Sequence, residues 1–144
     1  MIGEKGNPTE VKRTITIKMH DNYFEPSEIN INKDETIKFI VLNVGELVHE
    51  FNIATKEMHI KHQPEMMMMV ENEILLADKI DKKKMMEMSK KNPAMAHSHS
   101  NSVLLSPGEK AELIWKFSNT VDIEAACNVP GHYDVGMIAK ISNI

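Results

Sequence analysis

The chain has 144 residues, 26% of them charged, and a formal net charge of −4. This length fits one domain with a sizeable core, and the small net charge gives no indication of a nucleic-acid partner or a polybasic membrane surface. The single cysteine excludes an internal disulfide and any metal site that needs two thiolates from this chain. No apolar run reaches the roughly 18 residues that a membrane-spanning helix needs, so we expect no membrane insertion.

The N-terminal segment, residues 1–10, is polar and contains glycine and proline. We expect it to be a flexible lead-in to a single domain over residues 11–144. It lacks the apolar core of a signal peptide. A mature exported protein from which the signal has been removed and a cytosolic protein would both begin in this way.

Short stretches of alternating apolar and polar residues predict β-strands on both sides of a central segment. These stretches are residues 11–19, 29–32, 36–44 and 47–54 before it, and residues 102–105, 111–117, 121–127 and 136–142 after it. Residues 36–44 are apolar on both faces, which is typical of a central strand. Seven or eight short strands joined by turns predict an all-β sandwich.

The central segment, about residues 54–101, interrupts this pattern and has an unusual composition. It contains nine of the twelve methionines and four of the seven histidines but none of the aromatic residues. Residues 78–91 are mostly good helix formers followed by Asn-Pro, which predicts a helix, whereas residues 66–76 fit either a helix or a hairpin arm. Because the segment has few large apolar residues, we expect an insertion in one domain and not a second domain.

Thioether sulfur suits Cu(I), and imidazole binds both Cu(I) and Cu(II), so this insertion could bind copper. Met85 and Met88 are three residues apart on the predicted helix and could share one Cu(I) with a third donor; they could equally pack the insertion against the sandwich. The polar and closely spaced segment from Met95 to His99 favours metal binding. The candidate secondary copper ligands are Met85, Met88, Met95, His97, His99, His59 and His62.

A segment near the C-terminus places three metal-binding side chains at a regular spacing. Cys127, His132 and Met137 are five residues apart, with a Pro-Gly turn between the first two. His49 lies far upstream in a predicted strand. Two imidazoles, one thiolate and a weak axial thioether are the ligands of a mononuclear type 1 copper site. We therefore predict that these four residues bind one copper ion.

This Cys-x4-His-x4-Met arrangement at the end of a β-rich chain resembles the cupredoxins, the fold family of plastocyanin, azurin and auracyanin. The resemblance implies a Greek-key sandwich in which the last two strands flank the ligand loop. A type 1 site has no open position for a substrate, so we expect a copper-binding redox protein and not an enzyme.

Further segments resemble the periplasmic copper-tolerance cupredoxins: His49-Glu50-Phe51, residues 90–97, residues 105–109 and residues 126–133. The resemblance covers roughly residues 11–144, only loosely between 63 and 84. It implies a periplasmic protein that sequesters or oxidises copper. Two alternatives stay open. One is an electron carrier between redox enzymes, which needs a redox partner but no Met-rich arm, and the other is a copper chaperone or storage module that uses the insertion.

Glu50 departs from the pattern of many electron-transfer cupredoxins. Those proteins carry Asn or Ser directly after the upstream histidine, where it donates a hydrogen bond toward the thiolate region. Because Glu50 takes this place, we expect this hydrogen bond to be absent or supplied by another group. Such bonds tune the metal.

Overall fold

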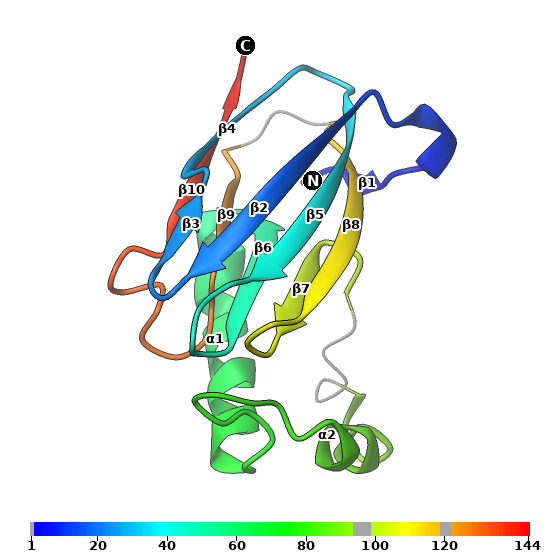
Figure 1. The fold of residues 1–144 in the computed structure, drawn as a ribbon. Helices are drawn as coiled ribbons and strands as arrows, with labels where there is room; N and C mark the ends of the chain where they lie inside the picture. Colours follow the sequence, from blue (N-terminus) through cyan, green and yellow to red (C-terminus); the bar gives the residue numbers. More distant parts are fainter. Residues whose placement is uncertain (1, 94–98, 119–121) are drawn as a thin grey trace.

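The computed structural model describes residues 2–93, 99–118 and 122–144 of the chain. Over these residues, two five-stranded β-sheets lie face to face, and two helices of the insertion lie along and beyond one of them (Figure 1). The first sheet has the strand order β1 (Glu4–Lys5), β8 (Lys110–Lys116), β5 (Thr36–Asn43), β2 (Arg13–His20) and β3 (Tyr23–Glu25). The second has the order β4 (Glu28–Ile31), β10 (Ile138–Asn143), β9 (Glu124–Ala126), β6 (His49–Ala54) and β7 (Ser102–Leu105). The predicted all-β sandwich with a partly helical insertion is confirmed.

Strand β5 lies at the centre of the first sheet, as its apolar composition predicts. It pairs in parallel with β2 and in antiparallel with β8. Phe39 on β5 is fully buried, and its ring centroid lies 5.4 Å from that of Phe51 on β6 and 6.2 Å from that of Phe117. The contact between Phe39 and Phe51 joins the two sheets across the core.

Strand β6 is buried along its whole length, although a strand of an antiparallel sandwich commonly has one face in solvent. Helix α1 (Lys56–Glu71) accounts for this burial. Its residue His59 places Nε2 3.2 Å from the backbone oxygen of Glu124 in β9, and its residue His62 places Nε2 3.3 Å from Oε2 of Glu50 in β6. The first half of α1 thus covers the outer face of the second sheet.

Both helices begin at side chains that cap them. Thr55 accepts a hydrogen bond from the N–H of Met58 at the start of α1, and Asp81 accepts one from the N–H of Lys84 at the start of α2 (Lys82–Ser89). The helix predicted over residues 78–91 is therefore present in a shorter form.

Residues 66–76 show both of the structures that the sequence left open. They are helical as far as Glu71, because α1 begins well before this segment, and the chain then turns back so that Leu75 pairs with Ile80. Met66, Met69 and Leu75 belong to the same buried cluster as the core of the sandwich. The insertion therefore packs on the main core through its methionines.

The N-terminal segment contains a short strand and a 3-10 helix. Strand β1 pairs with the edge strand β8, with Glu4 opposite Lys116, and the indole N–H of Trp115 donates a hydrogen bond of 3.0 Å to the backbone oxygen of Ile2. A short 3-10 helix follows at Pro8–Glu10. The unpaired backbone groups of β8 give this polar segment partners that its composition does not indicate.

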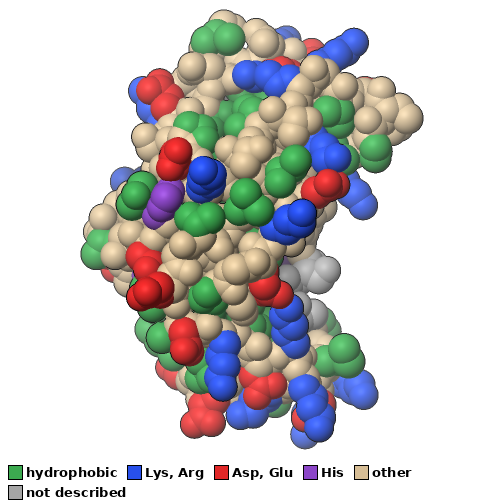
Figure 2. All heavy atoms as spheres, in the orientation of Figure 1, with side chains coloured by type: hydrophobic (Ala, Val, Ile, Leu, Met, Phe, Trp, Pro, Cys, Tyr) green, Lys and Arg blue, Asp and Glu red, His purple; other side chains and the backbone are tan. Residues whose placement is uncertain are grey.

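The surface carries charges of both signs. Figure 2 shows Lys and Arg side chains interspersed with Asp and Glu side chains over one face of the molecule, in keeping with the small net charge. Within the described ranges, no helix combines the length and the apolar composition that crossing a bilayer requires.

Candidate metal centre

Three of the predicted ligands meet at one end of the second sheet. Cys127 Sγ lies 3.3 Å from Nδ1 of His132 and 3.9 Å from Nδ1 of His49. One donor atom from each residue lies within 4.8 Å of the others. His49 begins β6, Cys127 follows the last residue of β9, and His132 lies in the loop before β10. Two imidazoles and a thiol from two separate segments, the start of β6 and the loop between β9 and β10, therefore surround a common point.

The loop between β9 and β10 is closed by its own backbone. The N–H of Cys127 donates to the oxygen of Met137 at 3.1 Å, and the N–H of Met137 donates to the oxygen of His132 at 3.1 Å. Gly131 and Gly136 have φ values of 90° and 93°, which residues with a side chain rarely adopt. These bonds hold the predicted ligands at fixed positions, and Met137 is fully buried at the end of the loop. Its role as an axial ligand stays a prediction.

Asp21 fixes the orientation of His49. The Nε2–H of His49 donates a hydrogen bond of 2.8 Å to Oδ1 of Asp21, which leaves Nδ1 as the nitrogen that faces Cys127. The same carboxylate accepts hydrogen bonds from the backbone N–H groups of Glu46 and Leu47. Burial raises the pKa of Asp21, but these hydrogen bonds outweigh it, so the pKa lies below its ordinary value. An ionised carboxylate behind a histidine is a common arrangement at metal sites.

Burial keeps the predicted ligands uncharged when no metal is bound. Burial raises the pKa of the Cys127 thiol to about 12. It lowers the pKa of His132 to about 4, helped by the neighbouring His49, and it lowers the pKa of His49 despite Asp21. A cysteine, which binds a metal as the thiolate, and two neutral imidazoles are soft or borderline donors, so the set fits a copper ion better than a hard cation such as Mg²⁺.

The hydrogen bond to the thiol is supplied by the main chain. The backbone N–H of Glu50 donates to Cys127 Sγ at 3.3 Å, so the residue that follows His49 still serves the sulfur without an Asn or Ser side chain. The Glu50 carboxylate is fully buried on the other side of β6. It contacts His62 and accepts hydrogen bonds from the side-chain amides of Asn52 and Asn128.

Comparisons with known proteins agree with this fold. Residues 1–80, more than half of the chain, match the sequence model of the cupredoxin-like domain. The chain belongs to the cupredoxin-like family. It is 36% identical over 146 residues to the copper-resistant cuproprotein CopI of Pseudomonas aeruginosa, which covers 97% of this chain and 81% of that protein. CopI of Rubrivivax gelatinosus is 28% identical over 140 residues, covering 96% of this chain and 71% of that protein.

Solved structures of auracyanins share the fold of this cupredoxin. Dithionite-reduced auracyanin from Roseiflexus castenholzii gives a TM-score of 0.64 at 15% identity, covering 93% of this chain and 98% of that chain. Auracyanin B gives 0.65 at 12% identity, covering 99% and 96%. Identities this low show a common fold alone. The predicted resemblance to cupredoxins related to copper-tolerance proteins is confirmed.

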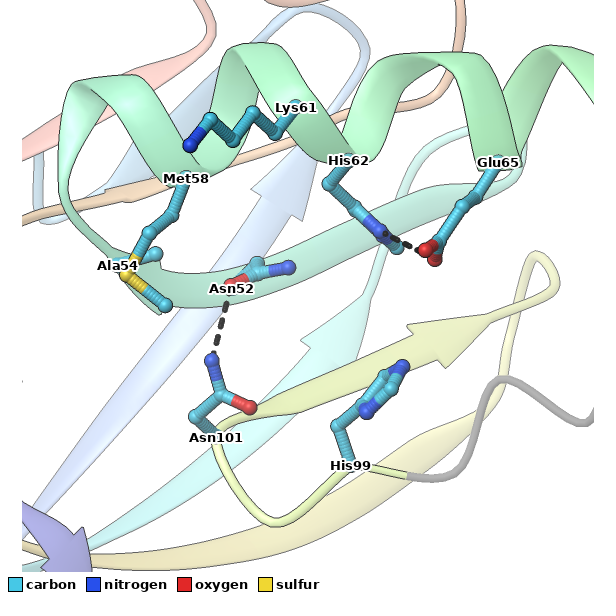
Figure 3. Close-up of a pocket in the computed structure, with 8 residues that line it drawn as sticks. All are labelled: Asn52, Ala54, Met58, Lys61, His62, Glu65, His99 and Asn101. Carbon is cyan, nitrogen blue, oxygen red and sulfur yellow. Dashed lines mark hydrogen bonds and ion pairs between the residues drawn. The ribbon is translucent and has the colours of Figure 1, made fainter. Parts of the chain in front are cut away.

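The histidines that were predicted as secondary ligands in the insertion separate into two groups. His59 is fully buried and contacts the backbone of Glu124 and the side chain of Asn128, so its contacts are those of a core residue. His62 and His99 line a common pocket (Figure 3).

The predicted methionine ligands are placed differently. Met85 and Met88 are partly buried against the hydrophobic core, as the packing alternative predicts. Met95 and His97 lie outside the described residues.

We predict that Asp21→Ala disturbs the orientation of His49 in the apo-protein. The variant should lower the free energy of unfolding by about 1–3 kcal/mol, since hydrogen bonds to a charged group are lost. Nitrogen NMR should show the His49 ring changing from a single Nε2–H tautomer to a mixture. Asp21→Asn should restore part of both effects, and Asp78→Ala, at an exposed position, should leave both unchanged. An unchanged tautomer in Asp21→Ala would contradict the assigned role.

Proposed function

We propose that this cupredoxin binds one copper ion in a type 1 site and acts in copper tolerance. The convergence of His49, Cys127 and His132 at one end of the second sheet carries the proposal, because two imidazoles and one thiolate are the strong ligands of such a site. The names of the relatives support the physiological role, since both are copper-resistant cuproproteins. The proposed location is the periplasm, which the resemblance to copper-tolerance cupredoxins implies.

His49, Cys127 and His132 would hold the ion, and the buried Met137 would supply a weak fourth donor. Bound copper would supply one-electron transfer between its Cu(I) and Cu(II) states. The chain's own groups preorganise the site: Asp21 holds His49 in one tautomer, and the backbone N–H of Glu50 donates to the sulfur. His49 and Cys127 are fully buried, whereas His132 is partly exposed. A redox partner would therefore approach from the side of His132.

An electron carrier is the second candidate function, and the partial exposure of His132 beside the exposed Val135 favours it. A carrier needs this edge of the site for docking. It does not need the methionines and histidines of the insertion. The two functions differ in what the cell loses when the protein is altered, so a test in cells separates them.

The copper site predicts an intense visible band when the apo-protein is titrated with Cu(II). Charge transfer from the Cys127 thiolate should give a band that saturates at one equivalent, and Cys127→Ser should abolish it. His20→Ala is the matched histidine control, because Nε2 of His20 pairs with Oε1 of Glu25 on β3 and His20 is not one of the predicted ligands, and it should retain the band. A wild-type protein without the band would overturn the type 1 assignment.

Copper binding should also release protons, and their number depends on how many ligands are protonated in the apo-protein. At about pH 7–8, Cys127 is protonated and both imidazoles are neutral, so each Cu(II) should release about one proton. The apparent affinity should then rise about tenfold for each unit increase in pH, because fewer protons compete at higher pH. Calorimetry in buffers of different ionisation enthalpy measures the number. Release of two or more protons would contradict neutral histidines, and Cys127→Ser should release almost none.

The role in tolerance predicts a phenotype in a copper-sensitive bacterium. Export of the wild-type chain to the periplasm should raise the copper concentration that permits growth, and Cys127→Ser should lose most of this protection. His20→Ala, expressed at the same level, should protect as well as the wild type. Equal growth with and without the wild-type chain would favour the electron carrier.

A further inference from the structure

A pocket of about 300 Å³ lies between α1 and the segment that enters β7 (Figure 3). Met58, His62 and Glu65 enter it from α1, at the spacing of four and three residues that places side chains on one face of a helix. His99 and Asn101 lie on the opposite wall, just before β7. The pocket thus brings two imidazoles, a thioether and a carboxylate together from two separate segments.

The two imidazoles are close enough for one ion to contact both. The ring centroids of His62 and His99 are 6.1 Å apart, with the ring planes at 88°. A bond from a metal to an imidazole nitrogen is about 2 Å long, and the nitrogen lies at the rim of the ring. An ion between the rings therefore needs only side-chain adjustment. Met58 is 43% exposed, so its flexible side chain can move toward the ion.

We propose that this pocket is a second copper site, selective for Cu(I), with His62, His99 and Met58 as ligands. Two imidazoles and a thioether, without a thiolate, form a donor set that suits the softer oxidation state. The inference deepens the proposed role in copper tolerance and rests on it for the choice of copper. It gives part of the insertion a role in binding Cu(I) at a site that contains none of the type 1 ligands.

The contacts of His62 indicate which of its nitrogens binds the ion. Nε2 lies 3.3 Å from Oε2 of the fully buried Glu50, and Nδ1 lies 3.2 Å from Oε2 of Glu65, whose side chain is 44% exposed. Loss of the Glu50 contact would leave a buried carboxylate without this partner, whereas Glu65 can turn into solvent. Nδ1 is therefore the ligand atom, and Glu50 supports the ring from behind, as carboxylates support metal-bound histidines elsewhere.

The experiment is an anaerobic titration of the reduced full chain with Cu(I) against a chromophoric Cu(I) chelator. The wild type should bind two equivalents, and Cys127→Ser should retain the pocket ion. In the Cys127→Ser background, His99→Ala and His62→Gln should each lower the affinity for the remaining Cu(I) by about tenfold or more. Met58→Leu should lower this affinity several-fold. The matched controls are His20→Ala and Met86→Leu, at a histidine that pairs with Glu25 and does not line the pocket and at an exposed methionine of α2, and they should have no effect.

The variants with an intact Cys127 show whether the fold is retained, since they should keep the visible band with Cu(II). If His99→Ala alone weakens Cu(I) binding, and His62→Gln and Met58→Leu leave it unchanged, the copper is bound by the stretch around His99. That result would overturn the assignment of the ion to the pocket. A wild type with the visible band but only one Cu(I) equivalent would also overturn it. If the visible band is absent but the pocket still binds Cu(I), the type 1 proposal fails and this inference stands.

Discussion

The antiparallel pairing of β6 with β9 is the constraint on which the metal centre depends. Asn52 lies opposite Ala126 in this register, so the chain that leaves β9 reaches the backbone of Glu50, whose N–H meets Cys127 Sγ at 3.3 Å. A slip of one residue would turn the sulfur to the opposite face of the sheet. The core contact between Phe39 and Phe51 and the cover supplied by α1 both hold β6 in this register.

The ligands that share a short loop could be predicted from sequence. Cys127, His132 and Met137 lie within one turn-containing segment, and local spacing is enough to place them near one another. His49 was found because an alternating pattern shows the strand that contains it. Asp21 could not be found in this way. It lies in the turn between β2 and β3, and its contact with His49 is created only when the two sheets pack.

Helix α1, which covers the outer face of the second sheet, could also not be predicted from the sequence. The beginning of α1 has no clear apolar stripe, and Pro64 interrupts the helix pattern. What stabilises this part of α1 is polar contact across the sheet, through His59 with β9 and His62 with β6. The N-terminal strand β1 was missed for a related reason, since an edge strand of the sheet provides its pairing partners. Tertiary contacts decide these elements, and local propensity does not.

The buried carboxylate of Glu50 ties the insertion to the sandwich. A buried carboxyl group needs hydrogen-bond partners, and here His62, Asn52 and Asn128 surround it. Removing α1 would take away the imidazole and uncover β6 at the same time. The insertion is therefore part of the support of the metal centre, and not an appendage on a finished domain.

The backbone and the side chain of Glu50 make different contacts, and so they can change independently in evolution. Its main chain serves the sulfur while its side chain holds the helix. A main-chain donor remains whatever amino acid occupies the position, apart from proline. The hydrogen bond to the sulfur therefore does not depend on which side chain follows the upstream histidine. A sandwich of this kind could gain a new segment on its outer surface, held by that side chain, without a change in its ligand loop.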